Sequence, residues 1–202
     1  MGFYARHILP VLIDRGMRNK AMTEHRPHIP SRATGRVLEI GIGSGLNIPY
    51  YPEAIEHLFG LEPSGKLLDL AGEAAEQAAF PVEFIESGAE QIPLDNQSID
   101  TVVSTWTLCS IPEIESALAE VRRVLKPGGR FLFIEHGLAP DPPVVRWQKR
   151  LAPVFRTLAG CNPDRPMDRL ISDAGFSFER INREYLDGPK FLAFHYQGEA
   201  RP

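Results

Sequence analysis

Three glycines and two carboxylates mark the part of the chain whose residue spacing suits ligand binding. Gly41, Gly43 and Gly45 follow an apolar run that contains a single acid, Glu39. Glycines in such a loop let the backbone turn tightly and approach a flat nucleoside without a Cβ in the way. Glu62 ends the next apolar run, where a carboxylate can accept hydrogen bonds from both ribose hydroxyls. These residues predict a nucleoside-binding site.

Two positions distinguish between kinds of nucleoside. A dinucleotide fingerprint needs its third glycine at position 46, where this chain has Leu46. Glu39 would repel a pyrophosphate, but it suits a ligand that carries an ammonium and a sulfonium group. Glu62 is compatible with either ligand. We therefore expect a cationic nucleoside rather than NAD, with Glu39 either facing that ligand or orienting the loop backbone.

Alternating strands and helices should position these residues. Short apolar runs bounded by turn residues predict five strands, at 36–41, 57–61, 82–85, 99–105 and 130–135. A helix capped by Ser64 should follow the second strand, and another should run from 114 to 125 and stop at Pro127. This alternation implies right-handed crossovers and a doubly wound, mostly parallel sheet, with its ligand outside the carboxyl ends of the strands.

The last third of the chain should complete the sheet. Helices are expected at 144–158 and 167–174, and strands at 178–185 and 191–196. The two strands lie near enough in sequence to pair antiparallel at a sheet edge. The predicted fold class is therefore α/β, with a mostly parallel seven-stranded Rossmann-like sheet and an antiparallel edge pair.

Composition bounds the organisation and the partners of the chain. Its 202 residues predict one domain, 1–202, made of a helical segment (1–34), a cofactor-binding core (35–137) and a substrate-side segment (138–202). A net charge of −4 argues against nucleic acid as a partner. Two cysteines, Cys109 and Cys161, suit a reducing cytoplasm; we expect both to be buried small apolar residues, and no metal site. The apolar stretch near residue 10 is too short to span a bilayer. The oligomeric state is left open.

The core of the chain resembles the class I S-adenosylmethionine-dependent methyltransferases, in particular the group of ubiquinone-biosynthesis C-methyltransferases. The resemblance lies in VLEIGIGSG (37–45), the acid of GLEPS (60–64), SGAEQIPLDNQSIDTVVS (87–104) and LAEVRRVLKPGGRFLFIEHG (118–137). It implies S-adenosylmethionine as cofactor. It also implies that the loop glycines line methionine and ribose, that Ala89 and Glu90 face the adenine edge, and that Thr105 faces the sulfonium. The full expected set of cofactor-binding residues is Glu39, Gly41, Ile42, Gly43, Gly45, Asn47, Glu62, Pro63, Ser64, Ala89, Glu90 and Thr105.

The C-terminal third resembles a narrower group, the thiol S-methyltransferases of animal membranes and their bacterial phospholipid methyltransferase-like relatives. The matching stretches are TLCS (107–110), EHG (135–137), Trp147-Gln148, GCNPDR (160–165) and DAGFS (173–177). This resemblance favours a small apolar acceptor, with a thiol preferred. A peripheral phospholipid N-methyltransferase and a non-catalytic cofactor-binding module are the alternatives.

One histidine is placed to act on the acceptor. A thiol or hydroxyl acceptor must lose a proton before it attacks a methyl group, and His136 is expected directly after the fifth strand, on the ligand side of the sheet. We therefore predict His136 as the general base. The helix at 144–158 carries Trp147 on one face and basic residues on others, so it could cover one sheet face, close over an apolar substrate or contact anionic lipid.

Overall fold

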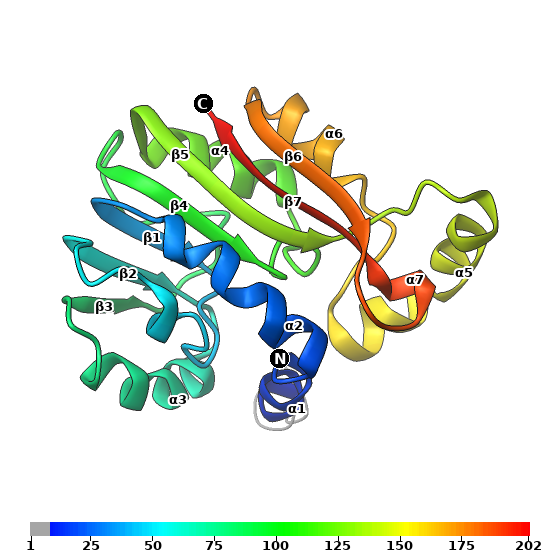
Figure 1. Cartoon of the computed structure of the whole chain (residues 1–202), viewed down its shortest axis with the longest axis horizontal. Helices are drawn as coiled ribbons and strands as arrows, with labels where there is room; N and C mark the ends of the chain where they lie inside the picture. Colours follow the sequence, from blue (N-terminus) through cyan, green and yellow to red (C-terminus); the bar gives the residue numbers. More distant parts are fainter. Residues whose placement is uncertain (1–8) are drawn as a thin grey trace.

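The computed structural model describes residues 9–202, and it contains a seven-stranded sheet with the strand order β3-β2-β1-β4-β5-β7-β6 (Figure 1). The first five strands run parallel to their neighbours, whereas β7 runs antiparallel to both β5 and β6. This confirms the predicted fold class, including the antiparallel edge pair. The strands are β1 (Arg36–Ile40), β2 (His57–Leu61), β3 (Val82–Ile85), β4 (Ile99–Thr105), β5 (Leu125–His136), β6 (Ser177–Tyr185) and β7 (Phe194–Arg201).

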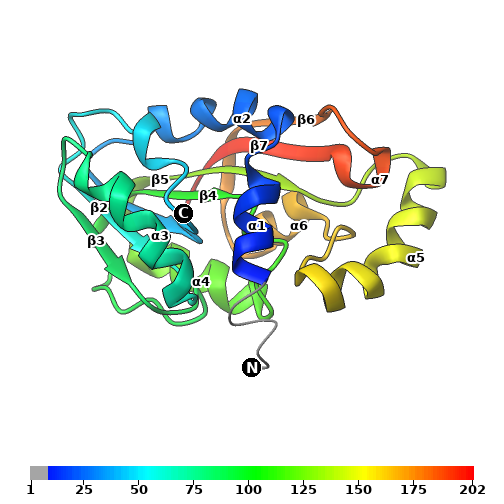
Figure 2. The ribbon, with the colours of Figure 1, turned by 90° about the horizontal axis from the view of Figure 1, so that it is seen from below.

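Helices lie on both faces of this sheet. Seen from below, α2 lies on one side of the sheet, and α4 and α6 lie on the other (Figure 2). The α-helices are α1 (Leu9–Met17), α2 (Lys20–His25), α3 (Gly65–Glu76), α4 (Ile114–Val124), α5 (Pro142–Ala159), α6 (Met167–Asp173) and α7 (Lys190–Ala193). The described part of the chain also contains three single-turn 3-10 helices, η2 (Arg26–His28), η3 (Pro30–Arg32) and η4 (Ile48–Tyr50).

The central strands are apolar on both faces because both faces are covered. In β5, Phe131 and Phe133 belong to the cluster that packs under α4 and α6, whereas Leu132 and Ile134 belong to the cluster on the opposite face. All four side chains are fully buried. Successive strand residues point to opposite faces, so a nearly continuous apolar run is typical of a strand buried on both sides.

Two expectations about strand boundaries were wrong. β5 begins at Leu125, which pairs with Ile99 ahead of a register shift, because Gly128 adopts a positive φ of 81° and the proline-glycine segment bends within the strand instead of ending before it. The apolar run at 191–196 is divided, since Lys190–Ala193 forms α7 and the strand starts at Phe194. As a consequence, His136 is the last residue of β5, opposite His195 of β7, and does not follow the strand.

The strand order places the ligand-binding edge. The chain adds β2 and β3 on one side of β1, and then β4 and β5 on the other, so the order reverses between β1 and β4. Ligands of open α/β sheets bind outside the carboxyl ends of the strands at such a reversal. Both α1 and α5 lie toward this edge of the sheet (Figure 1).

Candidate functional site

A cavity of about 240 Å³ opens at the carboxyl edge of the sheet, where the strand order reverses. Seven of the expected cofactor-binding residues line it, namely Gly41, Gly43, Glu62, Pro63, Ala89, Glu90 and Thr105. They come from the loop after β1, the end of β2, the loop after β3 and the end of β4. The structure therefore brings together residues that lie up to 64 positions apart in the sequence.

Glycine is required at two positions of the loop after β1. Gly41 has a φ of +69°, and a Cβ there would lie 2.3 Å from the Thr107 side chain. Gly45 has a φ of +77°, and its Cβ would lie 3.2 Å from the Cα of Ala71 in α3. Left-handed φ values are costly for residues with a Cβ. The glycines therefore let the loop pass close to α3 and to the segment after β4.

Glu62 is held in place by the backbone at the end of β2. Its carboxylate accepts hydrogen bonds from the backbone N–H groups of Ser64, at 3.0 Å, and Gly43, at 3.3 Å. Burial raises the pKa of Glu62, against the lowering effect of these two bonds. The Ser64 side chain makes no capping bond to α3 although the residue occupies the N-cap position. Ser64 contributes its backbone, and it does not line the cavity.

Glu39 is the most completely buried acid near the cofactor loop. It accepts hydrogen bonds from the Tyr51 hydroxyl, at 2.8 Å, and from the Asn47 amide. Asn47 also donates to Thr105 Oγ1 at 2.9 Å and accepts from Arg26 at 2.9 Å. Burial raises the pKa of Glu39 to about 7, although both hydrogen bonds and the Arg26 charge lower it. These hydrogen bonds indicate that Glu39 orients the backbone of the glycine loop.

The remaining loop residues lie beside the cavity. Asn47 is 1% exposed and belongs to the Glu39 network. Ile42 is buried against β2, where a Cβ on Gly60 would lie 2.5 Å from its side chain. A smaller adjoining hollow of about 50 Å³ is lined by Glu39, Ile42 and Thr105, among others.

Sequence reasoning missed the residues that close the cavity. Ile13 and Met17 of α1 line it, and so does the segment after β4 through Trp106, Thr107, Ser110, Ile111 and Pro112. Ser44 of the glycine loop donates a hydrogen bond to Asp14, which also pairs with Arg18 at 3.0 Å, so α1 is tied to the loop that it covers. The rule that ligands bind beyond strand ends could have identified the segment after β4, but no sequence signal indicated α1.

A sulfur-imidazole cluster lies beside the cavity. Cys109, His136 and Cys161 place one donor atom each within 4.8 Å of one another, and Cys161 Sγ lies 2.9 Å from His136 Nε2. A hydrogen bond from Cys161 and the charge of His136 hold the pKa of Cys109 well below its ordinary value, although burial acts in the other direction. The expectation that both cysteines are buried small apolar residues was wrong, because only Cys109 is buried and both sulfur atoms lie beside the His136 imidazole.

Glu135 is buried beneath the same segment. It accepts hydrogen bonds from Ser104 Oγ, at 2.6 Å, and from the Thr107 backbone, at 3.0 Å, whereas its Oε2 atom is buried with no partner. Burial and then the nearby Cys109 charge raise the pKa of Glu135 to about 8. For His136, burial lowers the pKa, but the Cys109 charge outweighs it, and the pKa is raised overall.

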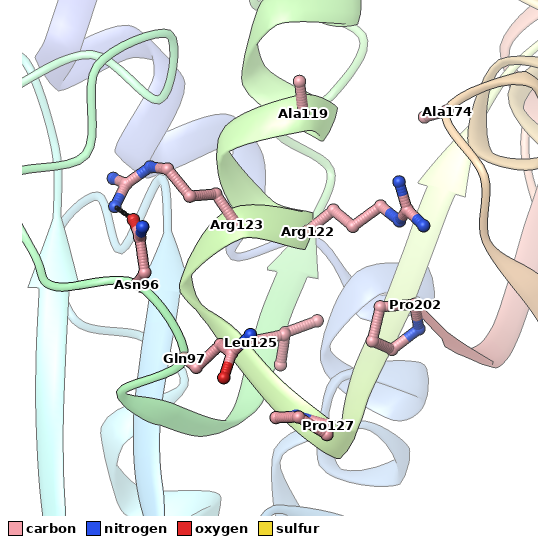
Figure 3. A pocket seen from close by; sticks show the side chains of 9 residues that line it. All are labelled: Asn96, Gln97, Ala119, Arg122, Arg123, Leu125, Pro127, Ala174 and Pro202. Carbon is pink, nitrogen blue, oxygen red and sulfur yellow. Dashed lines mark hydrogen bonds between the residues drawn. The ribbon is translucent and has the colours of Figure 1, made fainter.

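A larger hollow of about 550 Å³ lies at the opposite edge of the sheet (Figure 3). It is lined by the residues before β4, the end of α4 and the start of β5, with Arg122 and Arg123 on its walls. Arg123 is already bonded to Asn96, at 2.7 Å, and to Glu120. This edge carries the amino ends of the parallel strands, so it is not where the topology places a ligand.

The fold and the cavity define a class I S-adenosylmethionine-dependent methyltransferase. A family model described as a methyltransferase domain matches residues 38–133. The curated relatives include a phosphatidylethanolamine N-methyltransferase of Cereibacter sphaeroides, which is 31% identical over 72% of this chain and 71% of its own length. The chain therefore belongs to the methyltransferase family, and S-adenosylmethionine is its cofactor.

Other relatives differ in the acceptor that their names state. The human thiol S-methyltransferase TMT1A is 32% identical over 76% of this chain and 64% of its own length. A ubiquinone/menaquinone biosynthesis C-methyltransferase of Bartonella tribocorum is 30% identical over 63% of this chain and half of its own. This chain thus spans only half to two thirds of these two proteins. A solved S-adenosylmethionine-dependent methyltransferase of Leishmania major has a TM-score of 0.72 at 17% identity, over 98% of this chain and 80% of its own, and shows the same fold.

The residues of the cavity fit this cofactor. Gly41 and Gly43 leave room for a ligand beside the backbone, and Glu62 presents an acceptor for ribose hydroxyls. The carboxylates of Glu62 and Glu90 suit a ligand with positive charge and would repel a pyrophosphate. Family membership also favours an enzyme over the non-catalytic binding module.

Replacing Glu62 by alanine should weaken the binding of S-adenosylhomocysteine by about 1–3 kcal/mol, because the ribose hydroxyls then lose a buried partner. Titration calorimetry measures this change. Glu76→Ala, at the exposed end of α3, is the matched control and should bind as the parent does. An unchanged dissociation constant for Glu62→Ala would place the ribose contact elsewhere.

The parent should show no heat of binding with NAD.

The stability of the ligand-free protein should fall as pH rises, because Glu39 has a folded pKa of about 7 against an ordinary value of 4.5. The folded state then holds more protons than the unfolded state between these values, so the free energy of unfolding decreases with pH in that window. Urea unfolding at pH 5 and pH 8 measures the decrease. Glu39→Gln should remove about 2–3 kcal/mol of it. A variant with the same pH dependence as the parent would contradict the assignment.

Proposed function

We propose that the protein transfers a methyl group from S-adenosylmethionine to a small apolar thiol. The observation that carries this proposal is the set of apolar side chains along the cavity, Ile13, Met17, Trp106 and Ile111. Among residues 9–202, no lysine or arginine lines the cavity to bind an anionic acceptor. These side chains therefore favour an uncharged, apolar acceptor.

Methyl transfer to sulfur sets two tasks for the residues of this chain. The bound cofactor supplies the methyl group on a sulfonium, which is a good leaving group. The cavity walls must hold the acceptor sulfur in line with that methyl group, which is the proximity part of catalysis. The acceptor must also lose its proton, since the thiolate is the nucleophile. A sulfur–methyl bond then forms as the sulfonium–methyl bond breaks.

We propose that the loss of the acceptor's proton depends on His136. It ends β5 at the carboxyl edge of the sheet, and it is partly exposed. Its Nε2 atom already contacts the Cys161 thiol at 2.9 Å, and Cys109 is in the same cluster. His136 does not line the 240 Å³ cavity itself, so the loss of the acceptor's proton would be promoted through the group that His136 and the two thiols form together.

The thiol assignment is supported by a relative of the same family. The human relative at 32% identity is named a thiol S-methyltransferase. The cluster of Cys109, His136 and Cys161 is formed by three of the sequence stretches in which the C-terminal third resembles that group. The cofactor core alone, shared with relatives that methylate carbon or nitrogen, does not favour sulfur.

His136→Ala should lower the turnover of a weakly acidic alkyl thiol by roughly 100-fold, the scale of general-base catalysis, while S-adenosylhomocysteine binds as before. A more acidic aryl thiol should lose less, since more of it is thiolate at neutral pH. Mass spectrometry of the methylated products measures both rates. His28→Ala, an exposed histidine in η2, is the control. If the parent methylates no thiol of the series, the thiol assignment is wrong; if His136→Ala is equally fast with all of them, His136 has no part in proton loss.

A phospholipid headgroup is the second candidate acceptor, and one surface favours it. α5 exposes Trp147 (56%) and Val154 (52%), and the Arg150 guanidinium lies 5.9 Å from the centre of the Trp147 ring. Exposed aromatic and basic side chains on one amphipathic helix suit the interface of an anionic membrane. Within residues 9–202, no helix is both long enough and apolar enough to cross a bilayer. A relative named phosphatidylethanolamine N-methyltransferase is consistent with this candidate.

Flotation with anionic vesicles at low salt tests the lipid candidate, because electrostatic attraction is strongest there. If lipid is the acceptor, the parent should float and Trp147→Ala with Arg150→Ala should float several-fold less. Glu76→Ala again serves as the control. A parent that stays at the bottom of the gradient would exclude the lipid acceptor and leave the thiol proposal standing.

A further inference from the structure

Three potential metal ligands meet at one point from three separate elements. Cys109 lies in the segment after β4, His136 ends β5, and Cys161 directly follows the last residues of α5. Their donor atoms lie within 4.8 Å of one another. Within residues 9–202, this is the one group of three histidine, cysteine, aspartate or glutamate side chains that could hold a metal ion. The chain has two cysteines and six histidines, and this group contains both cysteines and one of the histidines. The two cysteines lie 52 positions apart in the sequence, so the fold and not local spacing brings them together.

The donor set selects a particular kind of cation. Two thiolate sulfurs and one imidazole nitrogen favour Zn²⁺, whereas Mg²⁺ and Ca²⁺ prefer oxygen ligands. We propose that Cys109, His136 and Cys161 bind one Zn²⁺ ion beside the cofactor cavity. Such a three-ligand set leaves a fourth tetrahedral position free for water or for a substrate atom.

The geometry is close to that of a tetrahedral site. With Zn–S of about 2.3 Å and Zn–N of about 2.1 Å, bound sulfur and nitrogen atoms lie about 3.6 Å apart. The Cys161 Sγ–His136 Nε2 distance of 2.9 Å must therefore widen by about 0.7 Å, and all three donor atoms lie within 4.8 Å of one another.

Hydrogen bonds to the backbone hold the segments that carry the ligands. Asn162 donates to the Cys109 carbonyl twice, from its backbone N–H and its side-chain amide, each at 2.9 Å. Arg165 donates to the Leu108 carbonyl. Gln148 of α5 donates to the Gly137 carbonyl at 2.9 Å, next to His136. Ligands fixed in this way require little reordering when they bind an ion.

Glu135 supplies a second observation beside the cluster, a buried carboxyl oxygen without a hydrogen-bond partner. It is 0% exposed, and its Oε2 atom is buried without a hydrogen-bond partner. It accepts a bond from the Thr107 backbone at 3.0 Å, so it lies under the segment that carries Cys109. A buried acceptor without a partner is costly, and a nearby cation would offset both this carboxyl group and the two thiolates.

The fourth position suggests how the cation would act, and this step rests on the proposed function. A thiol that binds Zn²⁺ is deprotonated, so a coordinated acceptor would reach the methyl group as a thiolate. Its proton would pass to solvent, and His136 would then act as a ligand that keeps the cation in place. Loss of His136 lowers turnover in this arrangement as well.

Titration of the reduced, chelator-treated full chain with Co²⁺ tests the metal site, since tetrahedral Co²⁺ bound by thiolates absorbs strongly in a characteristic way. One Co²⁺ per chain should bind, Zn²⁺ should displace it, and protons should be released. Cys109→Ser, Cys161→Ser and His136→Gln should each weaken Zn²⁺ binding by at least about 100-fold. His28→Gln, an exposed histidine outside the cluster, should leave it unchanged. These experiments need neither cofactor nor acceptor.

The parent protein alone can overturn the proposal, even if a variant fails to fold. Zn²⁺ should protect both cysteines of the parent from alkylation, as counted by mass spectrometry. Absence of thiolate–Co²⁺ absorption, or equal alkylation with and without Zn²⁺, would refute the site. A disulfide between Cys109 and Cys161 in the gently purified protein would refute it as well. Zn²⁺ binding by Cys109→Ser/Cys161→Ser with parental affinity would show that the ion is held elsewhere.

A separate measurement tests the role of the fourth position. Addition of 2-mercaptoethanol to the one-to-one Co²⁺ protein should shift the absorption, because a third sulfur enters the coordination sphere. An unchanged spectrum in a protein that methylates thiols would limit the ion to a structural part. A loaded metal site without methylation of any thiol would refute the proposed function while the site remains. The two failures are therefore distinguishable.

Discussion

A carboxylate buried at the end of the central strand is the constraint around which the cofactor side of this structure is organised. Glu39 is 1% exposed, so the protein itself must supply its hydrogen-bond partners. Tyr51 and Asn47 do so, and Asn47 connects them to Thr105 of β4 and to Arg26 before β1. Because Tyr51 and Asn47 both lie beyond the glycines, satisfying Glu39 also folds the glycine loop back over the end of β1. The glycines permit this turn, and the buried acid stabilises it.

A second buried acid has the same relation to the acceptor side. Glu135 lies near the end of β5, on the other side of β4 from Glu39, and accepts bonds from Ser104 and the Thr107 backbone. Burial raises the pKa of both acids, to about 7 and about 8. Burial is the largest cause in both cases, so a cation placed beside either acid would favour its ionised form. Each side of β4 thus carries a buried acid whose protonation depends on the charge that lies next to it.

The sequence was sufficient for the parts of the site that follow directly from strand ends. Gly41, Gly43, Glu62 and Thr105 could be predicted because each is adjacent to an apolar run that ends abruptly, and such ends meet at one edge of a parallel sheet. The sulfur-imidazole cluster could not be predicted. Cys161 reaches His136 only because α5 turns back at Gly160, in a left-handed conformation with a φ of 69°, and local sequence does not reveal where a long helix returns. The position of α1 over the cavity depends on Asp14 and Ser44, a pair that is 30 residues apart.

The segment after β4 joins the two halves of the site. Trp106 has a φ of +52°, which is unusual for a residue with a large side chain and marks a sharp turn directly after the strand. Beyond this turn, Thr107 and Ser110 line the cofactor cavity, whereas Cys109 between them lies in the sulfur cluster. A shift of this segment would therefore move cavity wall and cluster together. Thr107 also approaches Gly41, where a Cβ would lie 2.3 Å from its side chain. The stretch of backbone that packs against the cofactor loop is therefore the same one that carries Cys109.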